Sequence, residues 1–292
     1  MKLYIIGNGF DLFHGMKTSY NDFKAFVRGA DYDVYQAVND FAPAGDEWNE
    51  LESSLGDIDF YNIIEECEMY LTPYGADDFK DRDHHTYEFE IERITNNLTS
   101  DLLNQFCNWV SKIEVPEGNQ YKKFKTIDHD AIFLTFNYTS TLEQLYSINK
   151  DNVKHIHGSI NDSSSEIILG HGWERTETVN PAPGIDQDTR MSGAYALLDE
   201  MFDSNFKNSS EIINQEHVFF NSLSSVTEIV VIGHSLSHVD SRYFEEILNY
   251  VPQNTIWRYA LRTIEQDQEK TDSLVNLGVK KEHIKNVLLS SL

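Results

Sequence analysis

The sequence predicts an α/β fold with a doubly wound, mostly parallel sheet. Short apolar runs that end in glycine or polar turn residues alternate with segments of helical periodicity, which is the pattern of strands covered by helices on both faces. The length of 292 residues is near the upper limit for one hydrophobic core, and 40% hydrophobic residues are enough to form it. We therefore expect one α/β domain over residues 1–292 that carries a helical insertion.

The apolar runs give the positions of the expected strands. They are residues 3–6, 131–136, 153–157, 167–169, 228–232, 256–261 and 287–289. Helical periodicity predicts helices between them, at residues 140–146, 194–206, 211–223, 241–250 and 272–277. The first of these helices begins at Ser140, whose hydroxyl is a suitable cap.

A long, mostly helical section follows the first strand. From about residue 18 to about residue 125 the periodicity is helical, for example at 20–27 and 91–110, and acidic residues crowd its middle. We interpret this section as an inserted acidic helical lobe or cap with a solvated charged face. A second irregular stretch, residues 176–192, contains Pro181, Pro183 and Gly184 and is predicted to be a loop that could form a lid.

Charge and cysteine content limit the function classes. Subtracting 48 acidic residues from 23 basic ones gives a net charge of −25, which disfavours binding to nucleic acids and to anionic membranes. Cys67 and Cys107 form neither a disulfide framework nor a zinc-binding pair, and they suit a reducing compartment. The sequence shows no signal peptide and no membrane-spanning run, so we expect a cytoplasmic protein.

Polar and glycine-rich residues follow several of the predicted strands. They are Gly7-Asn8-Gly9, Thr135-Phe136-Asn137-Tyr138, His157-Gly158-Ser159, Gly170-His171-Gly172 and Gly233-His234-Ser235. Ligands of doubly wound sheets bind outside the carboxyl ends of the strands, where small residues let them approach the backbone and helix N-termini attract anions. These strand ends together predict a nucleotide pocket.

Each strand end also has an ordinary structural explanation. The pair Gly7 and Gly9 lacks the third glycine of the dinucleotide-binding fingerprint, because position 12 is leucine. Asn137 could cap the helix that follows it, and His157 could be a buried core histidine.

Motifs in this chain resemble the phage abortive-infection AbiH family. They are Ile5-Ile6-Gly7-Asn8-Gly9-Phe10-Asp11-Leu12 with His14-Gly15 and Thr18-Ser19-Tyr20, then Thr135-Phe136-Asn137-Tyr138, His155-Ile156-His157-Gly158-Ser159 and Ile232-Gly233-His234-Ser235-Leu236-Ser237-His238-Val239-Asp240. The resemblance runs nearly from end to end. It implies a role in antiviral defence, with a phage or host protein as the trigger.

The same positions are distantly similar to sirtuin-like NAD-binding domains. Gly7, Gly9 and Gly15 keep the glycine spacing of the first sirtuin loop, residues 135–137 match the T-x-N turn, His157 with Gly158 matches H-G, and residues 233–239 match the last motif. This similarity implies a sirtuin-like, Rossmann-like fold with an NAD pocket, used for hydrolysis in antiphage defence. It also suggests assembly into a homo-oligomer.

Some positions depart from the sirtuin pattern. Asp11 stands where sirtuins prefer a hydroxyl, Thr139 replaces the aspartate that usually follows the asparagine turn, and Lys17 takes the place of a proline. The structural zinc cysteines are missing, which disfavours a protein deacetylase with a zinc lobe.

Hydrolysis of the nicotinamide–ribose bond makes specific demands on such a pocket. Positive charge develops at C1′, so the site must hold the ribose and deliver water. Asn137 offers both donors and an acceptor without a charge, and His157 can act as the general base. We expect the amides after Gly7 and Gly9 to hold the diphosphate, Ser235 to hold the adenosine ribose, and Asp11 to cap its helix or contact a ribose. The predicted nucleotide-binding residues are Gly7, Asn8, Gly9, Phe10, Asp11, Gly15, Tyr138, Gly158, Ser159, Gly233, His234, Ser235 and Asp240, and no metal is expected.

Three other function classes remain open. In a serine hydrolase, residues 233–237 would form a nucleophile elbow around Ser235, with Asp267 and His283 as nominal partners. In a metal hydrolase, His155 and His157 would face the same side of a strand, with His171, Asp162 and Asp11 as further ligands. In a non-catalytic nucleotide-sensing or interaction module, the acidic lobe would contact a phage or host protein, and Trp48, Trp109 and Trp173 would be anchors.

Overall fold

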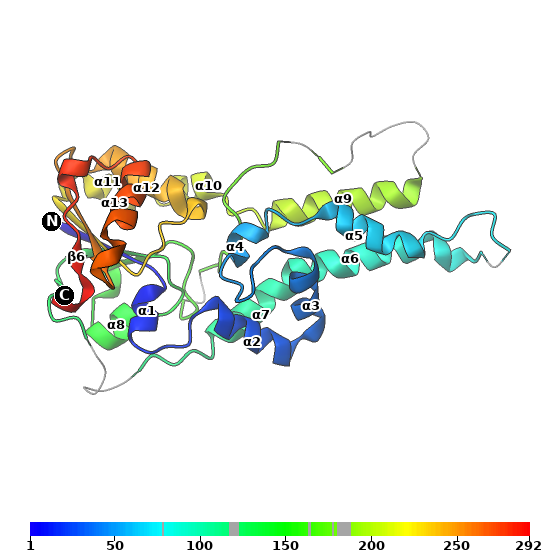
Figure 1. Ribbon diagram of the computed structural model, residues 1–292, viewed down its shortest axis with the longest axis horizontal. Helices are drawn as coiled ribbons and strands as arrows, with labels where there is room; N and C mark the ends of the chain where they lie inside the picture. The colour runs from blue at the N-terminus through cyan, green and yellow to red at the C-terminus, as the bar shows by residue number, and fades with distance from the viewer. Residues whose placement is uncertain (78, 117–122, 163–164, 177, 180–187) are drawn as a thin grey trace. The chain divides into compact units, whose positions relative to one another are not determined.

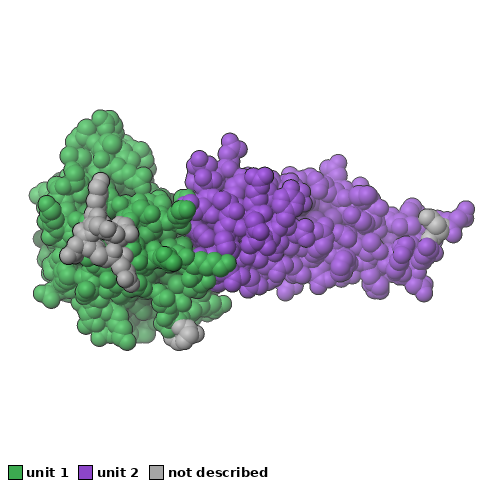
Figure 2. Space-filling view, turned by 90° about the horizontal axis from the view of Figure 1, so that it is seen from below, with its two compact units in different colours: residues 1–19, 110–168, 208–292 green, residues 20–109, 169–207 purple. Residues whose placement is uncertain are grey.

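The computed structural model describes residues 1–77, 79–116, 123–162, 165–176, 178–179 and 188–292. The chain forms two compact units, coloured separately in Figure 2. Unit 1 contains residues 1–19, 110–168 and 208–292, and unit 2 contains residues 20–109 and 169–207. Within the described residues, no helix is long and apolar enough to cross a membrane.

The described part of unit 1 is built on a six-stranded sheet in which all strands are parallel (Figure 1). The strands are β1 (Lys2–Ile6), β2 (Ile132–Thr135), β3 (Val153–His155), β4 (Glu228–Ile232), β5 (Ile256–Leu261) and β6 (Val287–Leu288). Their order is β3-β2-β1-β4-β5-β6, which is the order of doubly wound dinucleotide-binding sheets. The predicted fold class is confirmed.

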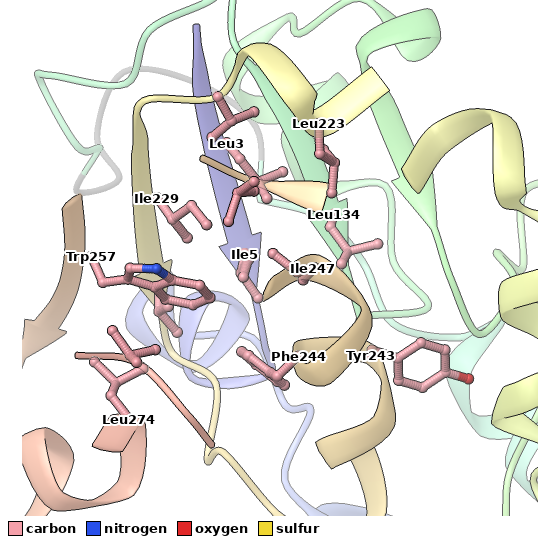
Figure 3. Close-up of a cluster of buried hydrophobic side chains, with 14 of the residues drawn as sticks. Leu3, Ile5, Leu134, Leu223, Ile229, Tyr243, Phe244, Ile247, Trp257 and Leu274 are labelled. Carbon is pink, nitrogen blue, oxygen red and sulfur yellow. The ribbon is translucent and has the colours of Figure 1, made fainter. Parts of the chain in front are cut away.

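Helices cover both faces of the sheet (Figure 1). They are α1 (Gly9–Phe13), α8 (Thr141–Tyr146), α10 (Ser209–Gln215), α11 (His217–Ser222), α12 (Ser241–Tyr250) and α13 (Asp267–Asn276). Because successive strand residues point to opposite faces, Leu3 and Ile5 of β1 pack against α10–α13, whereas Tyr4 and Ile6 pack against α1 and α8. Figure 3 shows the first of these clusters.

Unit 2 is helical. Its helices are α2 (Tyr20–Ala30), α3 (Tyr32–Phe41), α4 (Leu51–Ser54), α5 (Phe60–Cys67), α6 (Thr86–Leu98), α7 (Ser100–Val110) and α9 (Thr189–Ser204). Phe23 packs against Trp48 and Trp109 with ring centroids 5.8 and 5.1 Å apart, so both tryptophans belong to the core of this unit and are not surface anchors. The fully buried Lys207 ammonium lies 2.5 Å from Glu52.

Unit 2 corresponds only in part to the insertion expected over about residues 18–125. Its first segment, residues 20–109, lies inside that range. Its second segment, residues 169–207, lies outside that range. This segment contains α9, which packs against α6 of the first segment. Most of the proline-containing stretch at 176–192 lies outside the described residues, and α9 already begins at Thr189.

Several predicted boundaries differ from the structure. Residues 167–169 lie outside the strands, because Ile168 makes a single backbone hydrogen bond to His157 where a strand needs a ladder. The helix predicted at 211–223 is divided between α10 and α11 at Glu216. Ser140 precedes α8 without capping it by its side chain, because its hydroxyl accepts a hydrogen bond from Asn161 at 2.7 Å.

Candidate functional site

The carboxyl ends of β1 and β4 meet at the point where strand order reverses. The N–H groups of Gly7 and Gly9 donate to the carbonyls of Ile232 (3.0 Å) and Gly233 (2.8 Å), and the N–H of Phe10 donates to Gly7 (2.9 Å). A Cβ on Gly7 would lie 2.5 Å from Cα of His234, and one on Gly9 would lie 2.8 Å from Cα of Gly233. These glycines therefore let two loops pack backbone to backbone.

Asn137 lies at the end of β2 and connects to both neighbouring strands. Its side-chain Nδ2 donates to the carbonyl of Gly7 at 3.2 Å, and its own carbonyl lies 3.0 Å from Nδ1 of His155. The other ring nitrogen of His155 lies 2.9 Å from Glu143. Asn137 is only 7% exposed. Hydrogen bonds thus fix its position relative to β1 and β3.

Asp11 is buried beside Asn137. Its carboxylate is 1% exposed, and Thr139 donates a hydrogen bond of 2.5 Å to Oδ2, whereas Oδ1 has no hydrogen-bond partner among the described residues. Burial raises the pKa of Asp11 to about 6, and the side chains of Thr139, Thr141 and Asn137 oppose that rise. The helix cap expected of Asp11 is not observed, because the N-cap of α1 is Asn8 and the carboxylate faces Thr139.

His157 follows β3 and lies next to two other predicted site residues. Its Nε2 is 3.7 Å from Oδ1 of Asp240, and Oδ2 of Asp240 is 3.5 Å from Nε2 of His234. Both histidines are 3% exposed. The ring of Phe136 packs against His157 and His234 with centroids 5.2 and 4.3 Å apart.

The residues around Asn137 and the residues around His157 form one continuous cluster. Phe136 immediately precedes Asn137, and Gly7 contacts both the Asn137 side chain and the Cα of His234. The structure therefore brings together residues from the ends of β1, β2, β3 and β4 at one edge of the sheet.

Four other predicted site residues differ in their burial and contacts. The ring of Phe10 is fully buried in the core between β1 and α8, so it cannot contact a ligand. Gly15 is exposed, and a Cβ added to it would have no atom within 4 Å. The Tyr138 hydroxyl donates to the carbonyl of Ile168 at 2.8 Å. Ser235 is exposed, and its Oγ accepts a hydrogen bond from the N–H of Ser237 at 3.3 Å.

A family model described as bacteriophage abortive infection AbiH matches residues 3–260. This chain belongs to the AbiH family. No curated protein and no solved structure matches it. The sirtuin-like similarity therefore rests on the sequence motifs alone, and the family description indicates a role of this AbiH protein in phage abortive infection.

A pocket of about 900 Å³ in the AbiH fold was missed by sequence reasoning. It lies along the edge strand β3 and is lined by Gly158, Ser159 and His155, but not by Asn137 or His157. Its carboxylates are those of Glu143, Asp151, Asp162, Glu166 and Glu216. Most of the lining residues come from 140–168 and the others from 212–216, and nothing in the linear pattern marks the two stretches as one surface. The excess of carboxylates disfavours a phosphate group in this pocket.

The other hydrolase hypotheses gain no geometric support in this AbiH protein. Among the described residues, no group of three or more His, Cys, Asp and Glu side chains could hold a metal ion. Asp267, a nominal partner of Ser235, instead accepts a hydrogen bond from Asn286 at 2.9 Å.

Proposed function

We propose that this AbiH protein binds NAD or a related nucleotide at the carboxyl edge of its sheet and hydrolyses the nicotinamide–ribose bond during abortive infection. The observation that carries the proposal is the convergence of Asn137 and His157 beside the point where strand order reverses, in a sheet with the strand order of dinucleotide-binding folds.

The reaction needs one water molecule and one base. The bond between C1′ and the ring nitrogen breaks, and its electron pair leaves with nicotinamide, which becomes neutral. The oxygen of water forms the new bond to C1′, and the proton of water passes to His157. The products are ADP-ribose, nicotinamide and a proton.

Asn137 is placed to orient the water. Its Nδ2 is engaged by the Gly7 carbonyl, so Oδ1 is the atom of this amide that can accept a hydrogen bond from water. The low exposure of Asn137 and His157 keeps the reacting centre away from bulk solvent, which strengthens electrostatic interactions with the developing positive charge.

The proposal does not depend on a phosphate-binding loop after β1. The N–H groups of Gly9 and Phe10 already donate to backbone carbonyls, so they are not available to a diphosphate. We assign the contact with the adenosine ribose to the exposed Ser235 hydroxyl.

The test is turnover of NAD by purified protein, with nicotinamide and ADP-ribose separated by chromatography. Asn137→Ala and His157→Ala should each lose about 100-fold or more in kcat. Matched controls are Asn249→Ala in α12 and His217→Ala in α11, which are exposed and should keep wild-type turnover. Full turnover in both site variants would reject the assigned roles.

A second measurement tests the case in which this protein is active only during infection. NAD should fall in phage-infected cells that express the wild type, and should be retained in cells that express His157→Ala. Calorimetry with NAD and ADP-ribose then separates the two remaining hypotheses. Binding without product in either setting would favour the non-catalytic nucleotide-sensing module, and no binding at all would refute the nucleotide site.

A further inference from the structure

We propose that Asp240 is a positioning residue that fixes the ring and the tautomer of His157, and that His234 holds Asp240 in place. The catalytic consequence of this arrangement rests on the proposed function. The arrangement itself can be tested without turnover.

The loop after β4 is built to hold His234 in one orientation. Leu236 has a φ of +65°, which is rare for a residue with a branched side chain, and Gly233 has a φ of +70°. Within this turn the N–H of Leu236 donates to Nδ1 of His234 at 2.9 Å. The hydroxyl of Tyr259 donates to the His234 carbonyl at 2.5 Å. The imidazole is therefore anchored at its ring and at its backbone.

This anchoring decides where His234 carries its proton. Because Nδ1 accepts a hydrogen bond from Leu236, the neutral ring carries its hydrogen on Nε2. That nitrogen lies 3.5 Å from Oδ2 of Asp240. His234 therefore presents a positive N–H dipole to one oxygen of the carboxylate and leaves the other oxygen directed at His157.

Asp240 is also placed where a negative charge is favoured. It ends the 3₁₀ turn η5 (His238–Asp240) and is the N-cap of α12, so its carboxylate lies at the positive end of a ten-residue helix. Its side chain is 13% exposed.

The second oxygen of Asp240 faces Nε2 of His157 at 3.7 Å. A carboxylate on that side favours the tautomer in which Nε2 carries the hydrogen, so Nδ1 keeps a lone pair and is the atom that can accept a proton from water. When Nδ1 is protonated, the imidazolium is stabilised by the same carboxylate. The separation is longer than a hydrogen bond, as is common before a substrate tightens a site.

Aromatic rings pack around His157. Ring contacts come from Phe136, Tyr243 and Tyr138, with centroids 5.2, 5.4 and 6.5 Å away. Oδ1 of Asp240 lies 3.7 Å from Nε2 of His157, and the aromatic rings around the imidazole limit screening of this pair.

The decisive experiment is NMR of the purified full-length protein labelled with ¹⁵N and ¹³C in its histidines. In the wild type, the neutral His157 ring should be the Nε2–H tautomer. In Asp240→Asn, the titration midpoint of His157 should move down by about one pH unit because the charged form loses its partner, and Asp240→Glu should recover part of that shift. Glu245→Gln, one turn further along α12 and half-exposed, should leave His157 unchanged.

Two results would overturn the inference. One is an Nδ1–H tautomer for His157 in the wild type, a measurement that does not depend on whether any variant folds. The other is an unchanged His157 titration in a folded Asp240→Asn protein.

Turnover provides an independent reading. If NAD is hydrolysed, Asp240→Asn should lower kcat by about 10- to 100-fold with little change in KM, and the acidic limb of the pH profile should move with the His157 midpoint. If the wild type does not hydrolyse NAD, the proposed function fails, whereas the NMR result still decides whether Asp240 positions His157.

Discussion

Gly233→Ala should separate the two loops that meet at the carboxyl edge of the sheet. Gly233 has a φ of +70°, and a Cβ at this position would lie 2.2 Å from the backbone nitrogen of Phe10 and 2.5 Å from the carbonyl carbon of Gly9. These are backbone atoms, so no side-chain rotation relieves the contact. The left-handed conformation costs alanine about 1–2 kcal/mol. Losing the hydrogen bond from Gly9 to Gly233 costs about 1 kcal/mol more.

We therefore expect Gly233→Ala to lower the free energy of unfolding by about 3 kcal/mol, or Tm by about 6–12 °C. The assay is urea unfolding followed by circular dichroism. Gly15→Ala is the matched control, because Gly15 has a φ of +78° but no atom within 4 Å of an added Cβ, and it should cost about 1 kcal/mol. Equal losses in the two variants would refute the idea that close contact between the loops stabilises unit 1.

Three further predictions concern buried polar groups. Asp11→Asn should stabilise the protein by up to about 3 kcal/mol at pH 8 and by nothing below about pH 4. Burial raises the Asp11 pKa to about 6, so the wild type loses stability as pH rises through that value. Urea titrations across this pH range would show the difference. Glu52→Gln removes the carboxylate beside the buried Lys207 ammonium and should cost about 3 kcal/mol in the same assay. Tyr146→Phe removes the hydroxyl that lies 2.7 Å from Nε2 of His14 and should cost about 2 kcal/mol in urea unfolding at pH 8, where the ring is neutral because burial lowers the pKa of His14.

The sheet was largely predictable because its strands are buried on both faces. A strand such as β4 is apolar at nearly every position, and a polar turn follows it directly, so its limits are visible in the sequence. The false strand at 167–169 has the same local composition. What it lacks is a partner ladder, and pairing is a tertiary property that a short apolar run does not encode. The membership of residues 169–207 in unit 2 depends on packing between α6 and α9 and was missed for the same reason.

The candidate site was predictable to the level of strand ends. The carboxyl ends of parallel strands share an edge, so Asn137 and His157 could be expected near Gly7 and Gly233. The individual hydrogen bonds and side-chain directions of the site could not be predicted. The sequence does not reveal that Gly9 uses its amide to bind Gly233, or that Asp240 lies between two imidazoles, because side-chain directions are set by loops such as the left-handed turn at Leu236.

The central position of β1 has a consequence for how the protein is made. This strand lies between β2 and β4, which come much later in the chain. Leu3 pairs with Ile132, 129 positions later, and with Ile229, 226 positions later. During synthesis β1 can therefore pair with β2 only after residues 132–135 have left the ribosome, and with β4 only after residues 228–232 have, and such long-range pairing is slow. A partly translated chain holds Asn137 and His157 but cannot yet assemble the edge where they meet His234. Any harmful activity of that edge is thus withheld until residues 228–240 have been made and β4 has paired with β1.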